Sequence, residues 1–409
     1  MTETKEIITE PKEIMTEPKE LKPILVKGKY NEALVFAKAI EANCEDKLRQ
    51  YLDHPAFADT KVRVMCDVHL GKSAVVGFTA TSNELVIPSF VGVDIGCGVC
   101  ACDLGKGSYR FDKLDAFIRK NIPAGMNVHG ELHEKFERAL AFIAKRETNP
   151  LAADPGSFKT ALRELCEKQK SSAGRVFSSL GTLGGGNHFI EIDSGDQHRR
   201  WLLIHSGSRV LGAYTAGYHE TMALRETPET SPIKYLAGAS AADYLSDMAL
   251  VQLYATLNRA LMAMIIAEGF FKIDIRDAEY RDSVHNYIDF AASVIRKGAI
   301  SARRDEKLVI PFSMSEGAIL GRGKGNDNWN NSAPHGAGRK ASRTQSGKGL
   351  SLDEYRRQMK GVWSSTVCKD TLDESPMAYK RPRDILECIA DSVEVEQRLK
   401  PLYNFKAAD

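Results

Sequence analysis

Residues 85–104 read LVIPSFVGVDIGCGVCACDL, an apolar run that glycines interrupt at its centre. A run of this kind predicts a buried strand, because apolar and β-branched side chains pack well on a pleated surface. We predict strands in five further runs of the same character, at residues 61–68, 188–192, 201–204, 271–275 and 308–314.

Stretches with helical periodicity lie between these runs, at about residues 131–146, 157–170 and 239–268. In the last stretch, apolar residues recur at spacings of three and four from Leu250 to Met264. Such a stripe belongs to a helix packed in a core far more often than to a cofactor site.

Two more helices are predicted near the C-terminus. Ser351 and Glu354 form a capping box that opens a helix to about residue 362, and another helix is expected over residues 382–399. Helices and strands alternate irregularly, whereas a doubly wound sheet requires a regular alternation. We therefore predict an α/β fold of the mixed α+β type, a single compact domain with mixed or antiparallel sheets surrounded by helices.

The 409 residues are 43% hydrophobic and 27% charged, which is typical of a globular protein with a sizeable core. Residues 1–22 repeat a motif rich in Glu, Lys and Pro and are predicted to be a mobile tail. One catalytic domain is expected over residues 23–409. The formal net charge of +2 neither supports nor excludes a nucleic-acid partner.

The N-terminus lacks a basic segment followed by an apolar run, and no 18 consecutive residues are apolar. We therefore expect a cytoplasmic protein without a membrane partner. The eight cysteines are expected to be reduced thiols, with one or two available to a metal.

Polar residues gather among glycines at the ends of the predicted strands, where a metal site is expected. Asp94 and Cys97 lie three residues apart beside Gly96 and Gly98, so both side chains can turn toward one cation. Taken alone, this pair fits a turn aspartate beside a buried cysteine equally well.

Three histidines occupy similar surroundings. His188 follows three glycines by one residue, His205 ends a predicted strand, and His285 precedes an asparagine. A single histidine of this kind is more often structural than a ligand. Three of them together with a carboxylate and a thiol favour Mn, Zn, Fe or Co over Ca or Mg, and the residue types do not choose among these four.

The richest polar segment surrounds His335. Glycines at residues 321–325 and 336–338 expose backbone N–H groups, while Arg339 and Arg343 add positive charge, a combination that binds phosphate. A neutral imidazole beside bound phosphate can attack phosphorus, which makes His335 a candidate nucleophile. The alternative interpretation is a solvated basic loop.

Two common nucleotide-binding motifs are absent from the sequence. Gly71-Lys72-Ser73 lacks the earlier glycine of a P-loop, and no G-x-G-x-x-G opens a helix. These absences argue against a P-loop NTPase and a Rossmann dehydrogenase.

A cysteine motif also needs an interpretation. Cys97, Cys100 and Cys102 form C-x-x-C-x-C, but no fourth ligand of an iron–sulfur cluster stands at a familiar spacing. Strand alternation places Cys100 and Cys102 on the face opposite Cys97, so both are interpreted as core thiols.

Six segments, taken together, closely resemble the RtcB family of RNA-splicing ligases, from about residue 60 to the C-terminus. They occur in the family's order, and chance agreement of all six is not credible. The segments are Asp67–Lys72, Asp94–Gly98, Gly184–Phe189, His205–Arg209, His285–Tyr287 and His335–Arg339.

The resemblance implies a metal centre and a nucleophile. Two manganese ions would be held by the same five candidates as above, Asp94, Cys97, His188, His205 and His285. The family nucleophile corresponds to His335, which would attack the α-phosphate of GTP. The GMP would pass to an RNA 3′-phosphate, and an RNA 5′-hydroxyl would displace it; a 2′,3′-cyclic phosphate end would first be opened at the same site.

The resemblance also implies nucleotide and RNA contacts. The guanine nucleotide would be bound by Asn187, Phe189, Glu191, Ser313, Ala337, Gly338, Tyr379 and Lys406. Arg209 and Arg339 would bind RNA or triphosphate oxygens. Further expectations are a monomer and an activating partner similar to archease.

Several positions depart from the family pattern on the nucleotide side. Phe312 and Ser315 stand where glycines are usual, and Ala318 replaces a second nucleotide-binding serine. Ala407 follows Lys406 where the family has glycine. A paralogue specialised in RNA repair, rather than tRNA splicing, would fit these departures.

Two other functions compete with ligation. A manganese-dependent RNA phosphodiesterase would open cyclic phosphate ends without guanylylation, but the presence of His335 and Lys406 argues against it. An RNA-binding accessory factor without catalysis would have no need of the five metal-ligand candidates.

Overall fold

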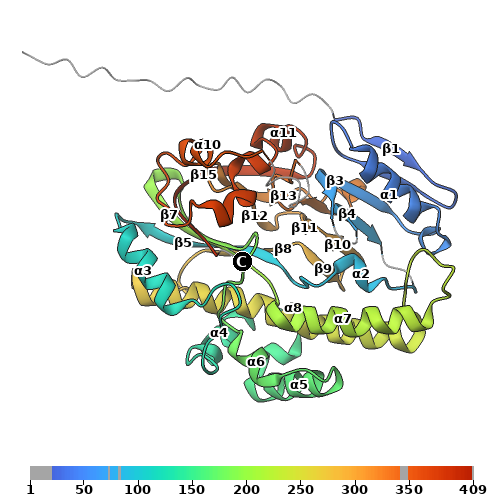
Figure 1. Ribbon diagram of the computed structural model, residues 1–409, viewed down its shortest axis with the longest axis horizontal. Helices are drawn as coiled ribbons and strands as arrows, with labels where there is room; N and C mark the ends of the chain where they lie inside the picture. The colour runs from blue at the N-terminus through green and yellow to red at the C-terminus, as the bar shows by residue number, and fades with distance from the viewer. Residues whose placement is uncertain (1–20, 72–73, 82–83, 341–348, 408–409) are drawn as a thin grey trace, which may run out of the picture.

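The computed structural model of the protein describes residues 21–71, 74–81, 84–340 and 349–407 (Figure 1). Within these ranges the chain forms two large sheets and a two-stranded ribbon, with long helices packed beneath them (Figure 1). Of the predicted tail only residues 21 and 22 are described, and Lys72 and Arg343 lie outside the described residues.

Seven strands form the larger sheet, in the order β12-β13-β15-β6-β7-β5-β8. All neighbouring pairs in it are antiparallel. The strands are β5 (Gly98–Lys106), β6 (Phe189–Ser194), β7 (Arg199–Ser206), β8 (Tyr280–Val284), β12 (Lys307–Ser313), β13 (Gly317–Gly323) and β15 (Val393–Lys406).

Six strands form the second sheet, in the order β1-β2-β3-β4-β10-β9. Its strands are β1 (Ile24–Lys27), β2 (Glu32–Val35), β3 (Val62–Leu70), β4 (Val75–Thr81), β9 (Asn286–Asp289) and β10 (Val294–Lys297). Strands β2 and β3 run parallel, and the other pairs are antiparallel. The ribbon pairs β11 (Ala299–Ser301) with β14 (Ser332–Pro334). The predicted α/β fold with mixed and antiparallel sheets is confirmed.

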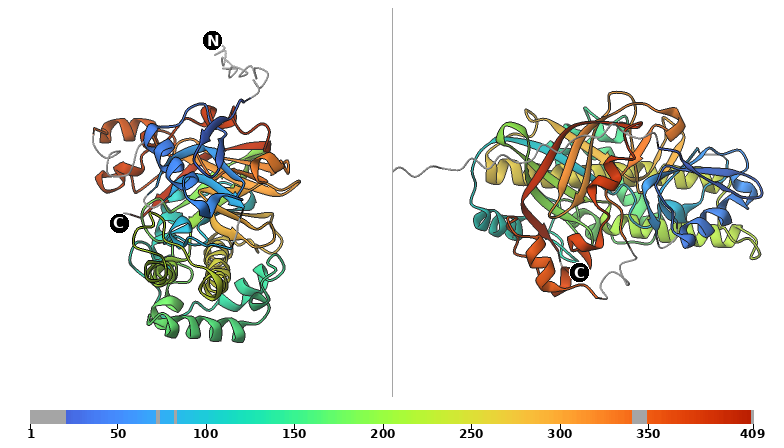
Figure 2. Two further views of the ribbon diagram at one scale, coloured as in Figure 1. Left: turned by 90° about the vertical axis from the view of Figure 1, so that its right-hand side faces the viewer. Right: turned by 90° about the horizontal axis from the view of Figure 1, so that it is seen from above.

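The longest helices lie together on one side of the sheets. Figure 1 shows α7 and α8 side by side beneath the strands, and Figure 2 shows α5 on their far side. The described helices are α1 (Ala42–Leu52), α2 (Pro88–Val91), α3 (Phe111–Asn121), α4 (Phe136–Ile143), α5 (Pro155–Lys168), α6 (Ala173–Ser178), α7 (Arg209–Glu226), α8 (Gly238–Ile266), α10 (Leu352–Gln358) and α11 (Pro382–Leu386). The predicted helices in the middle of the chain correspond to α4, α5 and α8, and Ser351 caps α10 as predicted.

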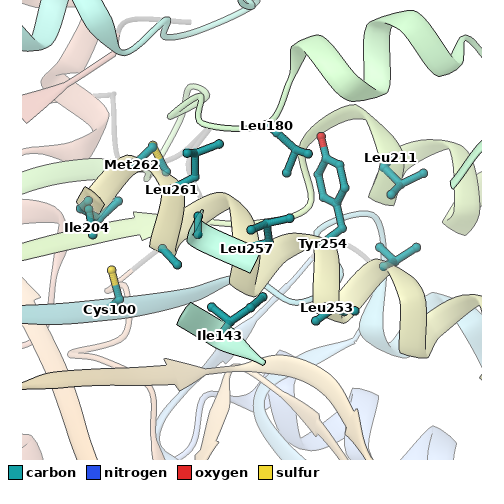
Figure 3. Packing of buried hydrophobic residues seen from close by; sticks show 14 of the residues in the cluster. Cys100, Ile143, Leu180, Ile204, Leu211, Leu253, Tyr254, Leu257, Leu261 and Met262 are labelled. Atoms are coloured by element: carbon teal, nitrogen blue, oxygen red, sulfur yellow. The ribbon is translucent and has the colours of Figure 1, made fainter. Parts of the chain in front are cut away.

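Helix α8 is the centre of the main core. Figure 3 shows Leu257 and Leu261 of α8 among side chains that include Cys100 of β5 and Ile204 of β7. The segment Gly238–Phe271 is long and apolar enough to cross a membrane, but 89% of its most apolar window is buried inside the fold. The leucine stripe is therefore core, as the spacing predicted.

Three predicted elements are wrong. Of residues 85–104, only the part from Gly98 onward is strand, because Pro88 opens the short helix α2 and a loop follows it. Residues 271–275 begin in a π-helical turn that extends α8 to Phe271, since a short apolar run does not distinguish helix from strand. Residues 382–399 form α11 and then the start of β15, because pairing with β13 and β6 outweighs local helix propensity.

Replacing Leu257 with Ala should lower the free energy of unfolding by about 2–5 kcal/mol, because the cavity left in a packed core cannot collapse fully. Leu257 is fully buried, whereas Leu224 on α7 is 60% exposed. Leu224→Ala is therefore the control and should change stability by less than about 0.5 kcal/mol. Urea denaturation measures both, and equal effects would contradict the central role of α8.

Candidate active site

Antiparallel pairing brings four of the ligand candidates to one end of the larger sheet. Strand β5 lies between β7 and β8 and pairs Val99 with His205 and Gly98 with Val284. Strand β6 pairs Phe189 with His205. Because neighbouring strands run in opposite directions, the starts of β5 and β6 lie beside the ends of β7 and β8. Cys97, His188, His205 and His285 stand at those four strand ends.

The thiol and two imidazoles form a compact buried cluster. Cys97 Sγ lies 3.2 Å from His205 Nε2 and 3.5 Å from His188 Nε2. These three ligand atoms all lie within 4.8 Å of one another. Asp94 Oδ2 is 3.7 Å from His188 Nε2, which adds a carboxylate to the cluster.

Backbone carbonyls hold both imidazoles in the form that binds a metal. His188 Nδ1 lies 2.9 Å from the Leu183 carbonyl, and His205 Nδ1 lies 3.1 Å from the Asn187 carbonyl. A carbonyl only accepts, so Nδ1 carries the proton and each Nε2 presents a lone pair to Cys97. Burial lowers the pKa of His205 well below its usual range, which keeps this imidazole neutral.

The donor set fits a metal ion. One thiol proton cannot satisfy the lone pairs of two Nε2 atoms and a carboxylate, whereas a cation would satisfy all of them. His285 Nδ1 is also buried and has no hydrogen-bond partner among the described residues. Its ring lies 5.1 Å from the ring of His205 and 4.7 Å from that of His335, between the cluster and the candidate nucleophile.

Gly207 allows the ligand loops to approach one another. A Cβ atom at this position would lie 2.4 Å from Asp94 Oδ1 and 3.2 Å from Cys97 Cβ. A larger residue directly after the strand that carries His205 would displace the Asp94 carboxylate and crowd Cys97.

His335 follows β14, and Asp67 of β3 orients it. Asp67 Oδ2 accepts hydrogen bonds from His335 Nδ1 at 2.6 Å and from the His335 backbone N–H at 3.1 Å. With Nδ1 protonated toward this buried carboxylate, Nε2 is left as the reactive nitrogen. Gly338 has a φ of +71°, and a Cβ there would lie 2.3 Å from the Asp67 carbonyl oxygen, so glycine lets the 336–338 loop close over Asp67.

Sequence reasoning missed the role of Asp67. The residue lies in a family-like segment, but its partner is 268 positions away and only the fold shows the pairing.

A cavity of about 610 Å³ opens beside His335 and beside His205, a member of the buried cluster around Cys97. It is lined by every predicted nucleotide contact, Asn187, Phe189, Glu191, Ser313, Ala337, Gly338, Tyr379 and Lys406, and also by His205, His285 and Arg339. The sheet explains part of this grouping. Strand β15 pairs Asn404 with Glu191 and Lys406 with Phe189, so these side chains share the face that carries His205.

Glu374 connects three of the cavity residues and was not predicted. Its carboxylate accepts hydrogen bonds from Arg339 at 2.8 Å, from Lys406 at 3.2 Å and from the Tyr379 hydroxyl. Glu374 lies in a 3₁₀ turn (Lys369–Glu374), where no sequence pattern distinguishes it from other acidic residues. The two cationic side chains are thus held at the cavity wall by a buried acceptor.

A second buried carboxyl, that of Glu191, also lines the cavity. Glu191 accepts a hydrogen bond from Asn404 Nδ2 at 2.5 Å. Burial raises the pKa of Glu191 to about 7, and it raises the pKa of the neighbouring Asp193 well above its usual range. Asp193 therefore stays protonated, while Glu191 can ionise near neutral pH.

Other predicted site residues lie at the periphery. Arg209 is not among the cavity-lining residues; its guanidinium donates to the Thr182 hydroxyl and the Gly125 carbonyl beside the glycine-rich loop. Phe312 lines the cavity, but Ser315 and Ala318 do not. Ala318 is fully buried in the core.

A second group of possible metal ligands is already paired with a lysine side chain. His219, Asp243 and Asp247 lie within reach of one ion. The Lys168 ammonium, however, donates to Asp243 at 2.8 Å and to Asp247 at 2.7 Å. This group is therefore an ion-pair network. Of the two groups, the cluster around Cys97 is the one whose ligand atoms are not bonded to a lysine.

Comparison with known proteins identifies the family. A family model described as tRNA-splicing ligase RtcB matches residues 49–407. The chain belongs to the RtcB family. The RNA-splicing ligase RtcB of Escherichia coli K12 is 31% identical over 387 residues, covering 88% of this chain and 93% of that protein. The tRNA-splicing ligase RtcB of Nanoarchaeum equitans is 27% identical over 390 residues, covering 78% of this chain and 81% of that protein.

Family paralogues also match. The RNA-splicing ligase RtcB2 of Escherichia coli ATCC 25922 is 26% identical over 374 residues, covering 84% of this chain and 86% of that protein. The resemblance to the RtcB family predicted from the six segments is confirmed.

Cys97→Ala should weaken metal binding by more than about 100-fold, because the alanine removes the atom on which both imidazoles converge. Cys100→Ala is the matched control, since Cys100 is equally buried but lies in the core against α8. Metal titration and elemental analysis of the purified proteins measure the effect. Full metal content in the Cys97 variant would show that this thiol is structural.

Proposed function

We propose that this RtcB-family protein is a GTP- and manganese-dependent ligase that joins RNA 3′-phosphate or 2′,3′-cyclic phosphate ends to 5′-hydroxyl ends. The proposal depends on the orientation of His335. Its Nδ1 donates to the buried Asp67, which leaves Nε2 as the reactive nitrogen, and its ring lies beside that of the ligand candidate His285. The names of the RtcB relatives, which describe RNA-splicing and tRNA-splicing ligases, support the same activity.

In the first step His335 would be guanylylated. Nε2 attacks the α-phosphorus of GTP, an N–P bond forms, and the bond to the β-phosphate oxygen breaks so that pyrophosphate leaves. Asp67 stabilises the positive charge that develops on the imidazole and keeps Nε2 directed away from itself.

In the later steps the GMP group would move to RNA. An oxygen of the RNA 3′-phosphate attacks the phosphorus of the phosphoramidate, and His335 leaves as a neutral imidazole. The RNA 5′-hydroxyl then attacks the 3′-phosphorus and gives its proton to water, an O–P bond forms, and the bond to the GMP phosphate oxygen breaks so that GMP leaves. A cyclic phosphate end would first be hydrolysed to the 3′-phosphate.

The metal ligands would be Asp94, Cys97, His188, His205 and His285. Manganese, when bound, supplies Lewis acidity that neutralises charge on phosphate oxygens. The protein residues position the substrates. Arg339 and Lys406, held by Glu374, place positive charge at the cavity wall. Arg209, whose guanidinium donates to the Thr182 hydroxyl and the Gly125 carbonyl, would contact an RNA strand beyond the cavity.

Glu191 and Tyr379 would recognise the base. An ionised Glu191 accepts hydrogen bonds from the N1–H and N2–H groups of guanine. Adenine has an acceptor nitrogen at N1 and no amino group at C2, so it cannot make the same pair of hydrogen bonds. Lys406 can donate to a base oxygen or ring nitrogen from the neighbouring strand position. The lost hydroxyl at Ala318 leaves these contacts in place because that side chain lies in the core.

The protein incubated with manganese and α-labelled GTP should acquire an acid-labile, base-stable label, whereas γ-labelled GTP should give none. His335→Ala should abolish the label, and Asp67→Asn should slow labelling by about 100-fold or more, because an asparagine amide favours the wrong imidazole tautomer. Absence of label, or label that persists in His335→Ala, would reject guanylylation of His335. Opening of cyclic phosphate ends without any label would identify a phosphodiesterase instead.

GTP affinity should fall as the pH decreases through about 7, because protonation of Glu191 converts an acceptor into a donor. Glu191→Gln should bind GTP weakly throughout and lose this pH dependence. Titration of GTP between about pH 6 and about pH 8 measures both proteins. If GTP affinity still falls with pH in Glu191→Gln, another group causes the pH dependence.

A role in RNA repair, cytoplasmic location, the monomeric state and activation by an archease-like partner all remain predictions. So does the division into a tail over residues 1–22 and a catalytic domain over residues 23–409.

A further inference from the structure

Two polar residues interrupt the apolar helix α8 near its centre. Asn258 and Arg259 are both fully buried. Burying a guanidinium and an amide costs free energy, and well-packed apolar side chains at such positions are often as stable or more stable. Core stability therefore does not explain the pair, and its contacts have to be considered one by one.

Asn258 holds the backbone on both sides of the metal cluster. Its Oδ1 accepts hydrogen bonds from the N–H groups of Gly181 at 2.8 Å and Thr182 at 3.2 Å. Its Nδ2 donates to the Gly207 carbonyl at 3.1 Å. One side chain therefore joins the loop that precedes His188 to the loop that follows His205.

Ser206 extends this connection to the ligand itself. Asn258 Nδ2 donates to Ser206 Oγ at 3.1 Å, and Ser206 Oγ donates to the Leu183 carbonyl at 2.8 Å. The same carbonyl accepts the Nδ1 proton of His188. The orientation of the His188 ring is thus linked by hydrogen bonds to α8.

Arg259 joins the other two ligand-bearing segments. Its NH1 group donates to the Gly96 carbonyl at 2.7 Å and to the Ser206 carbonyl at 2.9 Å, and each of these residues adjoins a ligand candidate. Its Nε and NH2 groups bind the two oxygens of Asp282 on β8, both at 2.7 Å. The strand β8, which directly precedes His285, is therefore attached to the same guanidinium.

The approach of the ligand segment to Arg259 depends on glycine. A Cβ atom at Gly98 would lie 3.1 Å from the Arg259 guanidinium carbon and 2.8 Å from the Ser283 carbonyl oxygen. No larger residue fits directly after Cys97 without moving the arginine or β8.

We propose that Arg259, assisted by Asn258, is the positioning residue of the metal centre. Its guanidinium sets the spacing of the segments that carry Cys97, His205 and His285, and Asn258 sets the loop of His188. The inference rests on the proposed metal centre, but it concerns residues that touch neither metal nor substrate. A lysine in place of Arg259 keeps the charge yet cannot span the two carbonyls and the carboxylate together.

The test uses Co²⁺ as a spectroscopic probe in the full-length protein. Co²⁺ bound to a thiolate gives a charge-transfer absorption band, and its ligand-field bands report coordination geometry. Arg259→Lys should bind Co²⁺ about 10- to 100-fold more weakly than the unaltered protein and give changed ligand-field bands.

Arg281→Lys is the matched control. Arg281 is also buried, is paired with Glu279 and Glu396, and donates to the carbonyls of Leu308 and Gly321 away from the ligand segments. Both substitutions should lower the stability of the metal-free protein in urea, but Arg281→Lys should leave Co²⁺ affinity and spectrum unchanged.

Asp282→Asn is the second variant and applies if Arg259→Lys does not fold. The amide retains one acceptor for Arg259, so Co²⁺ affinity should fall by less than in Arg259→Lys, with a spectral change in the same direction. Wild-type affinity and spectrum in the folded variants would overturn the inference, because they would show that Arg259 only stabilises the core. Absence of the thiolate band in the unaltered protein would overturn the proposed metal centre itself and the inference with it.

Discussion

The antiparallel register of β6, β7, β5 and β8 is the constraint on which the site depends. Each strand begins or ends with a ligand candidate, and reversal of direction between neighbours brings these ends together. A shift of one residue in any pairing would turn the side chains of that strand to the opposite face of the sheet. A shift of β6 would turn Phe189 and Glu191 away from the cavity, and a shift of β7 would do the same to His205.

The same register places the cavity-lining side chains of each strand on one face of the sheet and the core side chains on the other face. On β5, Cys100 and Cys102 face α8 and belong to the main apolar core, whereas Val99 faces the cavity. Helix α8 can be apolar nearly all round because strands lie above it and α7 lies beside it. Asn258 and Arg259 are polar residues of α8 that are fully buried, and they donate hydrogen bonds to backbone carbonyls beside the ligand candidates.

Buried carboxylates organise the rest of the site. Asp67 directs the imidazole of His335, and Glu374 holds Arg339 and Lys406 at the cavity wall. Each acceptor is out of water, so its hydrogen bonds are stronger than at the surface and the side chains around it are already placed before a ligand binds. A nucleotide would therefore meet a site that requires little rearrangement.

The sequence by itself identified the ligand candidates, because Asp94, Cys97 and the histidines stand in short motifs among glycines. It also determined the core stripe of α8, which depends only on helical periodicity. Only the tertiary structure decided that β15 is a strand, that Asp67 pairs with His335 and that Glu374 joins Arg339 to Lys406. These features come from contacts between residues that are distant in sequence or lack a local pattern, and such contacts exist only after the sheets have paired.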